Sequence, residues 1–280
     1  MVLFPNSKIN LGLHVAGKRP DGYHDLETVF YPVPLRDAAE MTTCSGKKDH
    51  PGFELIITGT NIPGAPTTNL CTKAWELIKN DFPTIPPVRM HLHKAIPVGA
   101  GLGGGSSDGA FTLILLNEEL KLNLPTEKLL DYALQLGSDC PFFILNKPCY
   151  ATGRGEIMEE IKVGLDDYHF VIINPEIHIS TADAFRGITA HEKPKHVLKE
   201  IIAQPVSTWK DNLINEFEEP VFKKHPVLEE IKQKIYASGA EYASMTGTGS
   251  SIYGIFHNSK KTANLLAGEK YRVYILNQSH

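Results

Sequence analysis

The sequence predicts a mixed α+β protein, with a chain long enough for one large domain or two ordinary ones. Its 280 residues contain short segments in which apolar side chains alternate and others in which they recur at helical spacing. Glycine and proline separate these segments, as they do at turns between elements. At this length a sizeable core can form. Periodicity alone predicts strands and helices without fixing their topology.

The first 33 residues are expected to form a hairpin. One apolar strand face is defined by Phe4, Ile9, Leu11, Leu13 and Val15, with a period of two from Ile9 onward. The other face carries Lys8, Asn10, Gly12 and His14. Pro20, Asp21 and Gly22 form a turn signal, and residues 27–33 read as the returning strand. Lys8 and Asn10 should therefore share the polar face of this strand.

Further elements follow in order along the chain. We expect strands at residues 53–58, 88–93, 169–174, 242–245 and 251–256. We expect helices at residues 70–80, after Ser106, from Thr126 to Gly137, at residues 197–203 and at residues 227–237. Asn69 is a suitable cap for the first of these helices.

Composition and charge exclude several classes of function. Lys+Arg total 28 and Asp+Glu total 32, so the net charge of −4 argues against a dedicated nucleic-acid binder. No apolar run approaches the roughly 20 residues of a membrane helix, so no membrane partner is expected. The start shows no signal peptide, and four scattered cysteines suggest reduced thiols. We therefore expect a cytoplasmic protein.

The strongest local signal is a glycine-rich segment, Pro97–Ser107. Five of the 23 glycines fall between Gly99 and Gly105, after a predicted strand and before a predicted helix. Glycines allow close backbone approach, and a helix N-terminus adds unpaired N–H groups, so this arrangement favours a phosphate site over a plain linker. The G-x-G-x-x-G match to dinucleotide-binding proteins is weak, because the preceding strand alternates with polar residues. Gly105 stands where a Walker loop needs lysine.

This segment resembles the phosphate loop of the GHMP kinases, a family of small-molecule kinases. Four other segments extend the resemblance over nearly the whole chain: Ser7–Leu11, Asp21–Leu26, Gly137–Phe143 and Met245–Gly249. The resemblance implies two α+β domains, a ribosomal protein S5 domain 2-like N-terminal domain and a ferredoxin-like C-terminal domain, with the active site in the interdomain cleft. We place the domains at residues 1–155 and 156–280. Asn6-Ser7 and Asp108-Gly109 depart from the residues that are common in the family.

The resemblance also implies an activity and its residues. The Asp-Gly-Tyr-His segment and the three-glycine run indicate phosphorylation of a cytidine-diphosphate-linked sugar alcohol, with ATP as co-substrate and Mg²⁺. Lys8 and Asp139 match the catalytic cation and the general base. The expected ATP-binding residues are Asn69, Lys94, Pro97, Val98, Gly99, Ala100, Gly101, Leu102, Gly103, Gly104, Gly105, Ser106 and Ser107. The expected acceptor-binding residues are Asn10, Tyr23, His24 and Phe185.

Other interpretations stay open at this stage. The chain could be another GHMP kinase, of the homoserine or mevalonate type, or a non-catalytic nucleotide-binding regulator on the same fold. Taken alone, Asp139 would more often be a helix cap, Lys8 a surface lysine and Phe185 a core aromatic. His91 and His93 share a strand face, but they have no third ligand and are expected to be solvated. Sequence does not decide between a monomer and a homodimer.

Overall fold

The structure is a computed structural model that describes residues 1–19, 24–44, 52–62, 68–188, 197–257 and 271–277. By their internal contacts the residues form two compact units, each made of separate chain segments. Unit 1 contains Met1–Ser7, Leu35–Val98 and Gly103–Asn146. Unit 2 contains Lys8–Pro34, Gly99–Leu102 and Lys147–His280. The glycine-rich segment is thus divided between the units, with its middle in unit 2 and its two flanks in unit 1.

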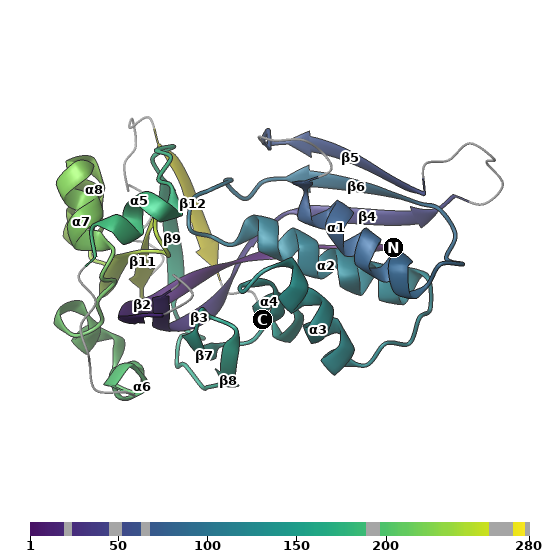
Figure 1. The fold of residues 1–280 in the computed structure, drawn as a ribbon. Coiled ribbons are helices and arrows are strands. Elements are labelled where there is room, and N and C mark those ends of the chain that lie inside the picture. The colour runs from purple at the N-terminus through teal and green to yellow at the C-terminus, as the bar shows by residue number, and fades with distance from the viewer. Residues whose placement is uncertain (20–23, 45–51, 63–67, 189–196, 258–270, 278–280) are drawn as a thin grey trace. The chain divides into compact units, whose positions relative to one another are not determined.

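Unit 1 is a four-stranded sheet with helices packed along it. The strands are β1 (Val2–Leu3), β4 (Ala38–Thr43), β6 (Val88–Lys94) and β5 (Phe53–Gly59), in that spatial order. The helices are α1 (Leu70–Asp81), α2 (Gly104–Glu119), α3 (Thr126–Leu136) and α4 (Cys140–Leu145). β5 and β6 are parallel and are connected through α1, whereas β4 pairs with β6 antiparallel. Figure 1 shows α1 and α2 side by side along this sheet.

Helix α1 shows why the local predictions succeed here. The side chain of Asn69 accepts a hydrogen bond from the backbone N–H of Cys71 at 2.9 Å, which caps the helix as expected. Cys71, Ala74 and Ile78 are buried at helical spacing. The predicted helix at residues 70–80 is therefore confirmed.

Unit 2 contains two four-stranded sheets. One has the order β2 (Asn6–Lys18), β3 (His24–Arg36), β7 (Cys149–Gly153) and β8 (Ile157–Glu160). The other has the order β10 (Tyr242–Met245), β11 (Ile252–Phe256), β9 (His169–Asn174) and β12 (Arg272–Asn277). The helical elements are α5 (Thr181–Arg186), α6 (Val197–Ile202), η2 (Val206–Asp211), α7 (Glu218–Lys224) and α8 (Pro226–Ala237). Helix α8 packs against β10 and β11 and buries Leu228, Ile231 and Ile235 in the core of this unit.

Strand β2 is buried on both faces, which the sequence pattern did not predict. Ile9 and Leu11 belong to the core as expected, but Lys8 and Asn10 are only 4% and 1% exposed. Other parts of unit 2 cover the polar face, so Lys8 and Asn10 are hydrogen-bonded within the protein. Phe4 was expected on the apolar face, but it precedes β2 and is exposed.

Other segments also differ from the expectations. The sequence pattern did not indicate β4, β7, β8, β12, α5 or α7, and the predicted domain boundary at residue 155 lies at the turn between β7 and β8. The packing units are not contiguous in sequence, unlike the division into 1–155 and 156–280, which stays a prediction about the two domains. The predicted turn at Pro20–Gly22 lies outside the described residues. Within the described part of the chain, no helix is both long and apolar enough to span a membrane.

Candidate functional site

The glycine-rich segment leads from β6 into α2 through a backbone that requires glycine. Gly99, Gly101 and Gly103 all have positive φ angles, of 67°, 78° and 70°. Helix α2 begins at Gly104, inside the glycine run, so Ser106 and Ser107 lie in its first turn. The first N–H groups of a helix have no intrahelical acceptor, and together with the helix dipole they attract anions. This geometry suits a phosphate group.

Within unit 2, the middle of this loop packs against the turn between β10 and β11. A Cβ atom added to Gly101 would lie 2.0 Å from the carbonyl oxygen of Thr246, a distance that no side chain tolerates. The N–H of Ser251 donates to the carbonyl of Ala100 at 3.3 Å. The glycine-rich loop and the turn at Thr246–Ser250 are therefore in direct contact.

Lys8 reaches the same loop from β2. Its backbone N–H donates to the carbonyl of Leu102 at 3.0 Å. Its ammonium donates to Asn10 Oδ1 at 2.6 Å and lies 4.9 Å from the ring centroid of Phe30. Lys8 is thus a buried, oriented cation and not an ordinary surface lysine.

Asn10, expected to bind the acceptor, is surrounded by protein partners. Its Oδ1 accepts from Lys8, and its Nδ2 donates to Thr28 Oγ1 at 2.9 Å. Its backbone N–H donates to Thr246 Oγ1 at 3.2 Å, and its carbonyl accepts from the hydroxyl of Tyr253 at 2.7 Å. These contacts make Asn10 an organiser of the Lys8 ammonium.

Asp139 occupies the N-cap position of α4 in unit 1. Its backbone has φ −84° and ψ −16°, and its side chain makes no capping hydrogen bond. The side chain is half-buried. A carboxylate that caps a helix accepts a hydrogen bond from an N–H of the first turn, and Asp139 does not, so helix capping is not the role of its side chain. Asp139 thus belongs to unit 1, whereas Lys8 belongs to unit 2.

Lys94, expected to contact the nucleotide, lies at the centre of a buried ion cluster in unit 1. Its ammonium donates to Asp37 Oδ2 and, at 2.6 Å, to Asp108 Oδ2, and its side chain is 2% exposed. Burial alone would lower the pKa of Lys94, but the two carboxylates hold it above its ordinary value. Burial raises the pKa of Asp108 to about 7, against the attraction of Lys94. Asn69, also expected at the nucleotide, caps α1.

The predicted acceptor-binding rings lie in unit 2. His24 stacks on Phe185 with ring centroids 4.7 Å apart and an interplanar angle of 20°. Phe185 also contacts Phe217 edge-on, with ring centroids 4.8 Å apart. Its side chain is partly buried against the core, so the ring both packs on the core and remains partly exposed. Tyr23 lies outside the described residues.

The chain is similar to known proteins at the level of family, of curated relatives and of solved structures. Residues 69–147 match "GHMP kinases N terminal domain", and residues 199–268 match "GHMP kinases C terminal". A 4-diphosphocytidyl-2-C-methyl-D-erythritol kinase of Bacteroides fragilis is 51% identical over 265 residues, which cover 95% of each chain. The chain belongs to the GHMP kinase family. The resemblance and the α+β fold expected from it are confirmed.

Solved structures of GHMP kinases share the fold. A crystal structure of 4-(cytidine 5'-diphospho)-2C-methyl-D-erythritol kinase has a TM-score of 0.82 and 28% identity, with 100% of both chains covered. A homoserine kinase from Cytophaga hutchinsonii has a TM-score of 0.72 and 15% identity, with 97% of this chain and 94% of that chain covered. At 15% identity the second likeness shows the fold alone.

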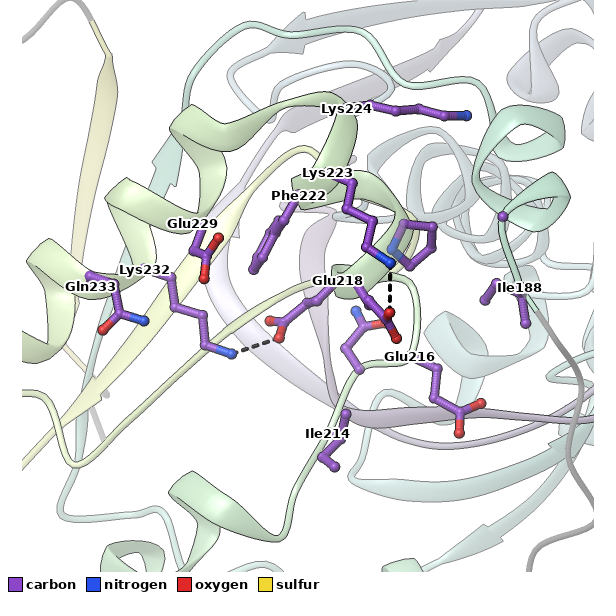
Figure 2. Close-up of a pocket in the computed structure, with 14 residues that line it drawn as sticks. Ile188, Ile214, Glu216, Glu218, Phe222, Lys223, Lys224, Glu229, Lys232 and Gln233 are labelled. Atoms are coloured by element: carbon purple, nitrogen blue, oxygen red, sulfur yellow. Dashed lines mark hydrogen bonds and ion pairs between the residues drawn. The ribbon is translucent and has the colours of Figure 1, made fainter.

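Two features of this GHMP kinase do not involve the predicted site residues. In unit 2, a cavity of about 840 Å³ is bordered by α7, α8 and the segment around Asn215 (Figure 2). None of the predicted site residues lines it, and Lys232 at its wall is bound to Glu218 at 2.6 Å. In unit 1, His91 and His93 share the hydroxyl of Thr58, at 2.9 and 3.0 Å. Among the described residues no cluster could hold a metal through His, Cys, Asp or Glu.

The sequence did not indicate three residues that organise this site. Asp37 receives the N–H groups of Ala95 and Ile96, Asp108 pairs with Lys94, and the hydroxyl of Thr246 contacts both Asn10 and Gly101. Asp108 departs from the residue that is common in the family at this position, and this departure was the only sequence feature that marked it. Thr246 lies in the Met245–Gly249 segment that resembles the family, but the pattern gave it no role, and no local pattern marks Asp37, whose partners are distant in sequence.

Proposed function

We propose that this protein is a 4-diphosphocytidyl-2-C-methyl-D-erythritol kinase of the non-mevalonate isoprenoid precursor pathway. It transfers the γ-phosphoryl group of ATP to the C2 hydroxyl of its acceptor. The observation that carries the kinase proposal is the loop from Pro97 to Gly103, with three left-handed glycines leading into the N-terminus of α2. The choice of acceptor is supported by curated relatives of this name, which are 51% and 52% identical in sequence to this chain.

In the proposed reaction Asp139 is the general base and Lys8 is the catalytic cation. The C2 hydroxyl oxygen attacks the γ-phosphorus, its proton passes to Asp139, and the bond from phosphorus to the bridging oxygen of ADP breaks. Lys8 stabilises negative charge on the transferring group. The position of Asp139 at the start of α4, where its side chain does not cap the helix, and the oriented ammonium of Lys8 support these roles.

The loop residues Pro97–Ser107 are proposed to hold the phosphates through backbone N–H groups. Mg²⁺ accompanies the ATP and neutralises charge on the β- and γ-phosphates when bound. The residues fit it, because the hydroxyl of Ser107 is buried and has no hydrogen-bond partner among the described residues. Ser106 and Ser107, in the first turn of α2, are the hydroxyls that would hold it.

The acceptor's cytosine is proposed to bind at Tyr23, His24 and Phe185. A base presents a stacking face and a hydrogen-bonding edge, which an aromatic and a polar side chain can recognise together. The contact between the rings of His24 and Phe185 supports a shared aromatic surface. Asn10 would influence acceptor binding indirectly, because its side chain orients the ammonium of Lys8.

The proposed activity is tested by a coupled ADP-release assay with three acceptors. We expect turnover of 4-diphosphocytidyl-2-C-methyl-D-erythritol and none of homoserine or mevalonate. Turnover of either of the latter alone would replace this function with that of another GHMP kinase. ATP binding without turnover of any acceptor would identify a non-catalytic regulator.

The residue roles are tested by two isosteric variants. Asp139→Asn should lower kcat by about 10²–10⁴, the usual contribution of a positioned base, with ATP affinity retained. Lys8→Met should lower kcat while the acceptor still binds. Wild-type turnover in either variant would refute the role of that residue.

The protein is further proposed to act in the cytoplasm. All four cysteines are free thiols, and three of them are buried. Unpaired thiols in a chain of this length suit a reducing compartment. Its partners in this proposal are its two small-molecule substrates.

A further inference from the structure

The ion cluster of Asp37, Lys94 and Asp108 lies at both ends of the glycine-rich loop. Lys94 is the last residue of β6, and the loop begins three residues later. Asp108 is in the second turn of α2, directly after Ser106 and Ser107. One ammonium therefore connects the strand that enters the loop to the helix that leaves it.

Asp37 holds the entering flank through the backbone. Its Oδ1 accepts the N–H of Ala95 at 2.6 Å and the N–H of Ile96 at 2.9 Å, while its Oδ2 accepts from Lys94. A carboxylate with two backbone N–H groups and one ammonium fixes the direction of these residues just before Pro97. The side chain of Asp37 is fully buried, so water cannot replace these bonds.

The leaving flank packs directly on Lys94. A Cβ atom added to Gly104 would lie 2.8 Å from Ile96 Cγ2 and 3.4 Å from Lys94 Nζ. The first residue of α2 therefore needs to be glycine in order to approach the ammonium. The hydrogen bond from Lys94 to Asp108 then fixes the helix on the same cation.

Direct contact between Lys94 and a nucleotide would require this cluster to open. The ammonium is bound to two carboxylates, and the side chain is 2% exposed. Separating it from either carboxylate would leave a buried charge uncompensated, which is strongly unfavourable. The cluster is thus better suited to hold the loop than to bind phosphate.

We propose that Asp37, Lys94 and Asp108 are positioning residues that fix the two flanks of the phosphate loop, and that Lys94 acts on ATP only through them. This inference rests on the proposed function of the loop as the ATP site. It does not depend on which alcohol is the acceptor.

The direction in which Asp108→Leu changes the KM for ATP distinguishes a positioning role of Lys94 from direct contact with the phosphates. If Lys94 touched the phosphates, removing the neighbouring negative charge in Asp108→Leu would leave ATP binding unchanged or strengthen it. If the cluster positions the loop, Asp108→Leu should raise the KM for ATP about tenfold, the scale of one lost charge-assisted hydrogen bond. Asp108→Asn keeps an oxygen for Lys94 and should restore most of the ATP affinity.

The experiment measures kcat, both KM values and the thermal midpoint for Asp108→Leu, Asp108→Asn and Lys94→Met. Arg89→Met is the matched control, because it removes a cation of the same strand from a surface pair with Glu54. It should leave the ATP KM unchanged. If Lys94→Met does not fold, the two Asp108 variants still decide the question.

Two results would overturn the inference. One is an ATP KM in Asp108→Leu that is equal to or below that of the wild type, with or without a lower thermal midpoint, since a purely structural role reduces the amount of active enzyme and not its KM. The other is an Asp108→Asn variant as impaired toward ATP as Asp108→Leu. Titration with ATP in the absence of acceptor separates these outcomes from a failure of the proposed function, because it requires no turnover.

Discussion

The hydroxyl of Thr246 contacts Asn10 twice. It accepts the backbone N–H of Asn10 at 3.2 Å and lies 3.3 Å from Asn10 Oδ1, to which it can donate. Its proton has a second acceptor in the carbonyl of Gly101, at 3.1 Å. Because Asn10 Oδ1 also accepts from Lys8, the orientation of the ammonium is coupled to the glycine loop through two buried side chains.

Removal of the Thr246 hydroxyl should therefore impair transfer more than binding. Thr246→Val keeps the shape of the side chain but leaves the buried backbone N–H of Asn10 without its acceptor, at a cost of about 1–3 kcal/mol. We expect kcat to fall about tenfold, with smaller changes in both KM values. Thr246→Ser keeps the hydroxyl and should recover most of the activity. Wild-type kcat in Thr246→Val would argue against the coupling.

Gly101→Ala should destabilise the protein and abolish the loop geometry. The left-handed backbone alone costs a non-glycine residue about 1–2 kcal/mol, and the new Cβ atom would collide with the carbonyl of Thr246. Urea denaturation should show a lower midpoint together with weaker ATP binding. Gly164→Ala is the control, because no atom lies within 4 Å of the added Cβ and its backbone carries no such strain. Equal stability of the two variants would contradict the argument.

Phe185→Ala should weaken acceptor binding selectively. The substitution removes the ring that stacks on His24, and one stacked base is worth about 1–3 kcal/mol. The acceptor KM should rise about tenfold or more, while the ATP KM stays near its wild-type value. Phe185→Tyr retains the ring and serves as the control. Parallel increases in both KM values would show that Phe185 supports the fold and not the acceptor.

The cysteines should differ in reactivity with alkylating reagents. Burial raises the pKa of Cys140 to about 12 and that of Cys149 to about 11, so both remain protonated thiols at pH 8. Cys71 is fully buried as well, with a pKa also raised by burial. Mass spectrometry of the native protein with iodoacetamide should find one adduct, at the half-buried Cys44, and four adducts after unfolding. Rapid native modification of Cys140 would refute this prediction, and Cys44→Ser should give no native adduct.

Local features of the chain could be predicted from the sequence. The helix at Leu70–Asp81 carries both its cap and its apolar period within one segment, and β9 matches the expected strand at residues 169–174. The loop was also predictable, because the glycines themselves mark positions with positive φ. Strand β4 was missed because its pairing with β1 and β6 is non-local.

The chemistry of individual side chains was less predictable. Alternation along β2 separated Lys8 and Asn10 from the core side chains, but it could not reveal that the polar face is covered too. Lys94 illustrates the same limit, since its partner Asp37 is 57 positions away in the chain. Tertiary contacts assign the roles of such residues, and a sequence pattern supplies only the residue types.

The division of the chain into units also has a consequence for biosynthesis. Residues 8–34 belong to unit 2, yet most of that unit begins only at Lys147. As the chain leaves the ribosome, unit 1 has all of its segments once Asn146 has emerged, whereas the N-terminal hairpin must wait for its partner strands. Fragments that end at residue 146 would carry β2 and β3 without β7, which pairs with β3, so the nascent strands would present an unpaired edge that needs chaperone protection.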